Sequence, residues 1–312
     1  MHGYFKRQRN FRKKNKKSLK KTILIIGGSG FIGQNLIREL NFSKYKVISA
    51  SRNIPKKYNK FNNIKYISVD VSKKSHFKRI KNKIDIVINL GGNINHSNKK
   101  ETYNSHFIGC KNLVNYFKDK SLQIFIQIGS SLEYGKVSNP HKEQYKCKPN
   151  SHYGMAKLKA TNYLKKSNLP YVILRLYQVY GPFQKKNRVI PNVVDSLIKE
   201  KTFRSTNGKQ IRDFLYVSDL VSLIKIILRK KSFNYGVYNV GSGKGIQVKK
   251  ILTQAKLMIQ KGNIEFGSAK MRKDELLKNY PNIQKVRKEF NWSSKFSIKK
   301  GLRHTIKFYE KN

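Results

Sequence analysis

Three side chains near the middle of the chain have the types and spacing of an acid/base centre: Ser130, Tyr153 and Lys157. Tyr153 and Lys157 are four residues apart, so they share one face if the segment is helical. A phenol ordinarily has a pKa near 10, and a nearby ammonium favours the phenolate that acid/base work requires. Ser130 follows a strand predicted at 123–128, where its hydroxyl could hydrogen-bond a reacting carbonyl or hydroxyl. A Tyr-x-x-x-Lys pair alone is a weak signal, so its context decides its meaning.

That context is a glycine-rich segment near the start of the chain. Residues 23–26 form a short β-branched apolar run, typical of a strand buried on both faces. Gly27, Gly30 and Gly33 follow at once, and residues 34–40 have the pattern of an amphipathic helix. Backbone N–H groups and the helix dipole at such a turn can bind a pyrophosphate, and glycine lets the chain come close enough. The segment predicts a dinucleotide site, with a glycine turn that binds nothing as the alternative.

Strands and helices alternate after this turn. Further strands are predicted at 46–52, 64–70, 84–90 and 123–128, with a helix at 105–118 and others near 191–200, 218–230 and 246–260. Such alternation implies parallel βαβ units, with ligands at the carboxyl ends of the strands. The predicted fold is α/β, a doubly wound parallel Rossmann sheet with a smaller C-terminal α/β substrate lobe. The predicted divisions are a disordered basic arm at 1–20, an NAD(P)-binding domain at 21–180 and a mainly substrate-binding lobe at 181–312, from which about 211–240 returns to the first domain.

The end of the second predicted strand indicates which dinucleotide binds. An acid there would hydrogen-bond the adenosine 2′-hydroxyl and repel a 2′-phosphate. This chain has Ser51 followed by Arg52, so charge favours NADP(H), with NAD(H) as the alternative. Further predicted cofactor contacts lie in the glycine turn and after the third and fourth strands: Ser29, Phe31, Ile32, Asp70, Val71, Leu90, Gly91 and Gly92.

The charge of the chain is extreme. Its 312 residues include 68 Lys and Arg against 16 Asp and Glu, a formal net charge of +52. Such a field attracts polyanions, so a nucleic acid, an anionic membrane or a nucleotide diphosphate would be drawn to it. The basic residues are spread along the whole chain among abundant Asn, Ile, Tyr and Phe. Drift towards AT-rich codons therefore competes with function as the cause of the charge.

The cysteines and the apolar residues indicate the compartment in which the protein is expected. Cys110 and Cys147 have no metal-like spacing, which fits free thiols in a reducing compartment, and a cytoplasmic location is expected. No run approaches 18 apolar residues, so no membrane span is expected. His141 falls in a loop, and nothing in the sequence implies a partner for it.

Together these motifs carry a resemblance over about residues 22–310. The chain resembles extended short-chain dehydrogenases/reductases of the NAD-dependent epimerase/dehydratase family, which modify nucleotide sugars. Besides the glycine turn, the landmarks are Ser130-Ser131 with Tyr134-Gly135, Tyr153-Gly-Met-Ala-Lys157, Leu174-Arg-Leu-Tyr-Gln-Val-Tyr-Gly-Pro182, Arg212-Asp-Phe-Leu-Tyr-Val-Ser-Asp219, Tyr238-Asn-Val-Gly-Ser-Gly243 and Phe290-Asn-Trp292.

The resemblance assigns roles to the first group of residues. It implies that Tyr153 is the acid/base, that Lys157 tunes it and anchors the cofactor ribose, and that Ser130 holds the substrate oxygen. Tyr177 is implied beside the nicotinamide. It also implies a homodimer formed through the helices at 105–118 and 153–166.

A second group is implied to bind the nucleotide sugar. Ser131 and Gln178 fall near the sugar, although the family usually has Asn at the second position. Arg212 matches a diphosphate-binding arginine of the family, and Arg272 lies where a second often occurs. Two guanidinium forks suit a diphosphate because their planar donors match paired oxygens.

The reaction is the least determined point. Family dehydratases carry an acid one or two positions after the active-site Ser or Thr, where this chain has Ser131 and Leu132, and Glu133 comes third. On an extended backbone that offset turns the side chain to the other face, which disfavours dehydration.

We therefore predict NADPH-dependent reduction of a 4-keto-(di)deoxy nucleotide sugar at C4, with Tyr153 as proton donor. A nucleotide-sugar 4-epimerase with retained NAD(P) is the near alternative, and a 4,6-dehydratase is less favoured. A non-catalytic RNA- or membrane-binding Rossmann protein is a distant one, because such a protein needs none of the three acid/base residues.

Overall fold

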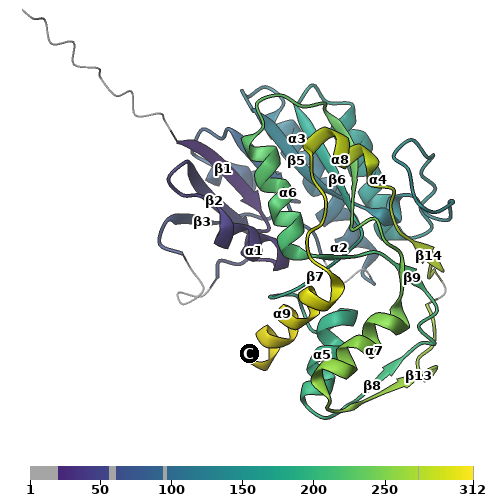
Figure 1. The fold of residues 1–312 in the computed structure, drawn as a ribbon. Helices are drawn as coiled ribbons and strands as arrows, with labels where there is room; N and C mark the ends of the chain where they lie inside the picture. The colour runs from purple at the N-terminus through teal and green to yellow at the C-terminus, as the bar shows by residue number, and fades with distance from the viewer. Residues whose placement is uncertain (1–19, 56–60, 94–96, 273, 312) are drawn as a thin grey trace, which may run out of the picture.

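The structure is a computed structural model that describes residues 20–55, 61–93, 97–272 and 274–311 (Figure 1). The basic arm predicted at 1–20 lies outside the described residues, apart from Lys20.

The main sheet has seven parallel strands in the order β11-β6-β5-β4-β1-β2-β3. They are β1 (Lys21–Ile26), β2 (Tyr45–Ser51), β3 (Ile64–Ser68), β4 (Ile86–Asn89), β5 (Ile124–Ser130), β6 (Tyr171–Leu176) and β11 (Gly236–Val240). The strand order reverses between β1 and β4, so their carboxyl ends border the crevice where this fold binds ligands. The predicted Rossmann sheet is confirmed.

Side chains of β1 alternate between two buried layers. Ile23 and Ile25 pack with α1 (Phe31–Glu39), α6 (Val217–Arg229) and α8 (Gln284–Phe290). Leu24 and Ile26 lie in the opposite layer, which includes α3 (Gly109–Phe117) and α4 (His152–Lys165). Because both faces of the strand are covered, its sequence is continuously apolar.

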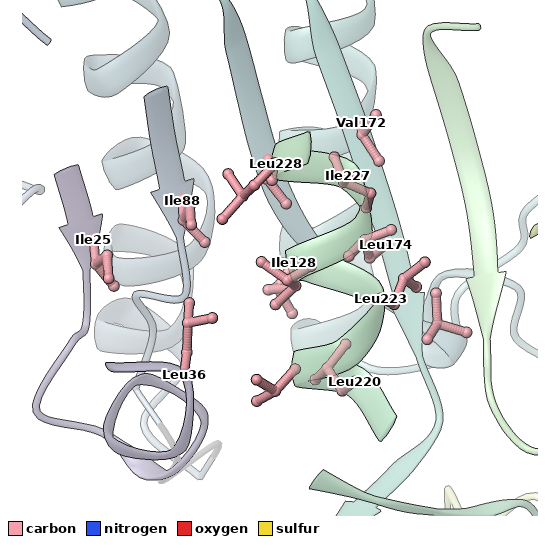
Figure 2. Packing of buried hydrophobic residues seen from close by; sticks show 14 of the residues in the cluster. Ile25, Leu36, Ile88, Ile128, Val172, Leu174, Leu220, Leu223, Ile227 and Leu228 are labelled. Carbon is pink, nitrogen blue, oxygen red and sulfur yellow. The ribbon is translucent and has the colours of Figure 1, made fainter. Parts of the chain in front are cut away.

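Helix α6 supplies much of the first layer. Figure 2 shows Leu220, Leu223 and Ile227 of this helix beside Ile128 of β5 and Leu174 of β6. This packing fixes α6 against β5 and β6, and β5 ends at the predicted acid/base centre.

The helix predicted at 105–118 begins earlier than expected and contains an irregular turn. It starts with α2 (Lys99–Tyr103), passes through a π-helical turn, η3 (Asn104–Ile108), and continues as α3. Among the described residues of this half, two 3-10 helices also occur, η2 (Lys74–Arg79) and η4 (Ser131–Glu133).

A smaller C-terminal lobe lies below the main sheet in Figure 1. Its core is shared by α5 (Val189–Ile198), α7 (Val248–Ile259) and α9 (Ile298–Glu310). Three small sheets complete it: β7 (Gln178–Tyr180) with β10 (Phe214–Tyr216); β12 (Ile246–Gln247), β9 (Ile211–Arg212) and β14 (Lys278–Asn279); and β8 (Thr202–Ser205) with β13 (Asn263–Phe266).

Between these segments the chain returns to the main sheet as β11, which pairs with β6. The predicted division at 180 and 181 stays a prediction. Across the described ranges, no helix has the length and apolar character needed to cross a membrane.

Candidate active site

Helix α4 presents Tyr153 and Lys157 on successive turns. Ser151 caps the helix by accepting a hydrogen bond from the Gly154 N–H at 3.1 Å, which fixes where the helix begins. The buried Lys157 Nζ donates to the Ile128 carbonyl of β5 at 2.8 Å and lies 5.8 Å from the centre of the Tyr153 ring. The lysine thus joins the helix to β5 and places its charge beside the phenol.

Ser130 ends β5 and is buried. Its Oγ accepts a hydrogen bond from the Leu132 N–H at 3.2 Å and so caps the short helix η4. That bond uses a lone pair, so the hydroxyl proton can still be donated to a substrate oxygen.

Glu133 turns away from the predicted chemistry, as expected, but for a different reason. Residues 131–133 form a 3-10 turn rather than an extended segment, so the period-two argument was wrong. The fully buried carboxylate folds back to accept the Ser130 N–H at 2.8 Å, and it also accepts from the Thr161 hydroxyl and from Arg175 Nε, both at 2.9 Å. With these donors in place, Glu133 is a structural carboxylate.

His106 lies next to the predicted acid/base, although no sequence pattern indicated this position. The π-helical turn carries it, and its ring meets the Tyr153 ring edge-on with centroids 4.9 Å apart. Its Nε2 is 3.0 Å from the Asn93 carbonyl oxygen, and a Cβ at Gly92 would lie 2.0 Å from the imidazole. A π-helical turn departs from the 3.6-residue period of an α-helix. The helical period therefore does not predict which way His106 faces.

The glycine turn has the geometry of a dinucleotide site. Gly27 has φ +77°, and a Cβ there would lie 3.0 Å from the backbone of Leu90, so the turn and the end of β4 are in direct contact. A Cβ at Gly33 would lie 2.5 Å from the Gly27 carbonyl oxygen. The two strand ends at which cofactor contacts were predicted therefore meet, and only glycine fits between them.

Helix α1 begins at this turn, with Gly30 at its N-cap. No side chain of the described residues caps it. The N–H groups of the first turn, at Phe31, Ile32 and Gly33, are therefore suited to the oxygens of a pyrophosphate.

The end of β2 carries no acid. Ser51 Oγ accepts from the Ser29 N–H at 3.3 Å, which links β2 to the glycine turn. Arg52 is exposed. Asp70 accepts from the N–H and hydroxyl of Ser72 at 3.0 and 2.7 Å. Burial acts to raise the pKa of the Asp70 carboxyl, but these bonds and the charge of Arg52 outweigh it and lower the pKa.

Val71 lies against the helix that follows β4. Its carbonyl accepts from Asn112 Nδ2 at 3.0 Å, and its side chain would lie 2.5 Å from a Cβ at Gly109. Val71, one of the residues predicted to contact the cofactor, is thus buried, and its carbonyl oxygen already accepts a hydrogen bond.

A cavity of about 300 Å³ joins Tyr153 to the predicted substrate residues. Gln178, Arg212 and Arg272 all line it, although they are far apart in the sequence. The other lining residues are Leu132, Asn150, Ser151, His152, Asp274, Glu275, Leu276 and Asn279. Ser131 lies behind the wall, where its Oγ accepts from Asn279 Nδ2 at 3.1 Å.

The two arginines differ in exposure. Arg212 is buried, and its guanidinium donates to the Ile211 carbonyl at 2.8 Å and to the Leu276 carbonyl and Glu275. Burial lowers the pKa of Arg212 from its ordinary value, although Glu275 opposes the shift. Arg272 is exposed and donates to the same Glu275 carboxylate.

Tyr177 and His141 form a buried pair that the sequence did not predict. The Tyr177 hydroxyl lies 3.0 Å from His141 Nδ1. Burial raises the pKa of Tyr177 well above its ordinary value. Burial, reinforced by the charge of Arg175, lowers the pKa of His141 to about 4. The contact of Tyr177 with the nicotinamide stays a prediction. Because the hydroxyl is hydrogen-bonded to His141, another part of Tyr177 would have to make that contact.

A larger cavity, about 550 Å³, lies at the amino ends of the first strands. Its lining includes Lys20, Lys46 and Lys65 but none of the predicted site residues. Because parallel sheets bind ligands at their carboxyl ends, the smaller cavity beside Tyr153 is the candidate active site.

Comparisons with known proteins agree with this geometry. The family model for the NAD dependent epimerase/dehydratase family matches residues 23–241. The chain is 28% identical to CDP-abequose synthase of Salmonella typhimurium, over 93% of this chain and 98% of that protein. It is 27% identical to a putative UDP-glucose 4-epimerase of Methanocaldococcus jannaschii, over 93% and 99%. The structure of UDP-glucuronic acid 4-epimerase from Bacillus cereus in complex with UDP-glucuronic acid and NAD has the same fold, with a TM-score of 0.84, 24% identity and coverage of 93% and 99%.

Proposed function

The chain belongs to the NAD-dependent epimerase/dehydratase family and is an NAD(P)-dependent enzyme, and from this premise we propose that it uses NADPH to reduce a 4-keto-deoxy nucleotide sugar at C4. Modification of nucleotide sugars follows from membership of the family itself.

The position of Glu133 is the observation that favours reduction over dehydration. Dehydration requires an acid that can protonate a departing hydroxyl, and the acid nearest Ser130 in the sequence is bonded to Arg175 and Thr161 instead. Of the described residues that line the cavity, the two acids both lie beside arginines. Glu275 is paired with Arg212 and Arg272, and Asp274 Oδ1 is 3.9 Å from Arg272 Nε. The arrangement therefore supports proton donation by Tyr153 and reduction of an existing ketone.

The residues of the chain divide this work. The Ser130 hydroxyl donates a hydrogen bond to the substrate oxygen and orients it, while keeping its proton. Tyr153 gives a proton to the same oxygen as it becomes an alkoxide, and the charge of Lys157 stabilises the phenolate that remains. The dinucleotide, when bound, supplies the hydride.

The residues present fit a dinucleotide. The uncapped first turn of α1 and the contact between Gly27 and Leu90 suit its pyrophosphate. We propose the phosphorylated cofactor because Ser51 and Arg52 stand where an acid would repel the 2′-phosphate.

The cavity wall also fits a polar substrate. Arg212 and Arg272 supply the positive charge for a diphosphate. Asn279 is nearly fully buried, and its Oδ1 has no hydrogen-bond partner among the described residues. A buried acceptor left without a partner costs free energy, so a donor on the ligand would be favoured there.

A 4-epimerase is the second candidate. With a retained NAD(P) to take up and return the hydride, the same three residues would serve to remove the proton of a C4 hydroxyl and to give it back to the ketone oxygen. The relative from M. jannaschii carries the name of a putative UDP-glucose 4-epimerase.

We also propose a homodimer formed through α3 and α4. The surface near the start of α4 exposes Met155 and Tyr103, and Lys159 Nζ stacks 5.1 Å from the Tyr103 ring. Replacing Met155 by Glu would place a charge in such an interface, so light scattering should report a smaller particle than the wild type gives. An unchanged particle mass would contradict this interface.

The reaction is tested by releasing bound nucleotide from denatured protein, identifying it by mass spectrometry, and then following NADPH absorbance. A reductase should be purified largely without cofactor and should consume NADPH stoichiometrically with a 4-keto-6-deoxy nucleotide sugar. Stoichiometric retained NAD or NADP, with no net consumption and with interconversion of C4 epimers, would replace the reductase by the epimerase.

A further inference from the structure

The carboxylate of Glu275 accepts hydrogen bonds from both arginines that line the candidate substrate cavity. Glu275 Oε1 accepts from Arg212 Nη2, and its Oε2 accepts from Arg272 Nε at 3.0 Å and Nη2 at 2.7 Å. Arg212 belongs to β9, whereas Arg272 lies only three residues before Glu275. Each carboxylate oxygen therefore binds a different guanidinium, and the side chain bridges them.

The bridge formed by Glu275 lies in the wall of the cavity, and it carries a negative charge. Glu275 is largely buried, with 17% of its side chain exposed. Burial acts to raise the pKa of its carboxyl, but the charge of Arg212 and the hydrogen bonds from Arg272 outweigh burial and lower the pKa. Near neutral pH the bridge is a carboxylate between two guanidiniums.

A carboxylate and a phosphate offer the same pattern of paired anionic oxygens to a guanidinium fork. The N–H groups that Glu275 engages are therefore those that a diphosphate would need. Both anions cannot hold these donors in the same geometry, so one displaces the other.

We propose that Glu275 is an internal competitor of the substrate diphosphate and sets the negative charge that a ligand must carry to bind here. The inference rests on the proposed function, because that function supplies the diphosphate. With Glu275 in place, its single negative charge offsets the charge of one of the two guanidiniums that the ligand meets. A diphosphate can still displace the carboxylate, whereas a monophosphate gains much less.

Charge selection has a measurable consequence. A site that is mostly self-occupied binds its ligand with an affinity reduced by the fraction of open molecules. Glu275→Gln keeps the shape and one acceptor oxygen but removes the charge. It should tighten binding of CDP or UDP by about three- to tenfold. It should also lower the ratio of UDP affinity to UMP affinity, because a monophosphate no longer has to displace a charged carboxylate.

The experiment is isothermal titration calorimetry of the full chain with CDP, UDP, dTDP and GDP, and with UMP and CMP, at one pH and one salt concentration. Glu265→Gln is the matched control. It makes the same substitution at an exposed glutamate outside the cavity lining, where Glu265 Oε2 is 3.8 Å from Arg204 Nε, and it leaves the bridge intact. Its affinities should stay within about twofold of the wild type, since exposed ion pairs contribute little.

Two outcomes would overturn the proposal. Weaker diphosphate binding by Glu275→Gln would make Glu275 a support for the arginines rather than their competitor. Equal tightening by Glu265→Gln would show that the effect comes from the net charge of the protein and not from the bridge. If Glu275→Gln does not fold, Glu275→Ala is used in the same titrations with the same expectation.

Arg272→Gln separates this proposal from the proposed function. Loss of diphosphate binding in that variant, without tightening in Glu275→Gln, would reject the competitor and keep the substrate site. Failure of the wild type to bind any of the four diphosphates would reject the substrate site itself.

Discussion

Arg175 Nε lies 2.9 Å from Glu133 Oε2, and both side chains are almost completely buried. The pair joins β6 to the turn that carries Ser130. Through the Thr161 hydroxyl the same carboxylate also reaches helix α4, which bears Tyr153 and Lys157. One buried carboxylate thus connects the three elements on which the proposed chemistry depends.

Glu133→Gln should therefore destabilise the protein strongly. The substitution leaves Arg175 buried without its counter-charge, which costs about 3–5 kcal/mol in comparable buried pairs. Chemical denaturation monitored by circular dichroism measures the change in the free energy of unfolding. Thr161→Val removes one hydrogen bond to the charged carboxylate but leaves the ion pair, and it should cost about 1.5–3 kcal/mol. If Glu133→Gln costs no more than Thr161→Val, the ion pair does not hold this region together.

Tyr153→Phe should reduce kcat by at least about a hundredfold, because it removes the proton donor while keeping the ring. The ring still packs against His106 and beside Lys157, so binding of NADPH should stay close to that of the wild type. Stopped-flow absorbance for turnover and nucleotide fluorescence for binding separate the two effects. Turnover that persists would remove Tyr153 from the mechanism.

Local patterns predicted the parts of the molecule that local physics determines. The β-branched run and the glycine spacing predicted β1, its turn and α1, since each feature lies within a few residues of the next. The i, i+4 spacing of Tyr153 and Lys157 was confirmed by α4 for the same reason.

Contacts between distant segments escaped prediction. Glu133 and Arg175 are 42 residues apart, and Arg212 and Glu275 are 63 apart. No periodicity links them, because their pairing follows from how the sheet and the small lobe assemble. Even the correct expectation that Glu133 turns away rested on an extended backbone, whereas a capped 3-10 turn is the cause.

His141 should make stability sensitive to acid. Burial lowers its pKa to about 4, below the ordinary value of 6.5, so the unfolded chain binds a proton that the folded chain excludes. Stability from this residue is therefore fully present above about pH 6.5 and is lost as the pH falls through 4, with a total of about 3 kcal/mol.

The unfolding free energy of the wild type should be compared with that of His141→Gln from pH 7 to pH 4. The difference between the two matters because Asp213 acts in the opposite direction: burial raises its pKa to about 6, so its contribution falls as the pH rises. Parallel curves for the two proteins would show that His141 does not titrate as described.

The pair Ser51→Asp with Arg52→Asn should move the cofactor preference from NADPH towards NADH. The new carboxylate would accept from the adenosine 2′-hydroxyl and repel a 2′-phosphate, and the second change removes the cation that attracts it. The ratio of kcat/KM for the two cofactors, measured with the same 4-keto substrate, should change by at least about tenfold, since one hydrogen bond to a charged group contributes on the order of 1.5–3 kcal/mol. Arg79→Asn is the control, because it removes a nearby exposed cation whose guanidinium donates to the Ser68 carbonyl at 2.7 Å. A ratio that shifts as much in the control would assign the preference to the overall positive field and not to the end of β2.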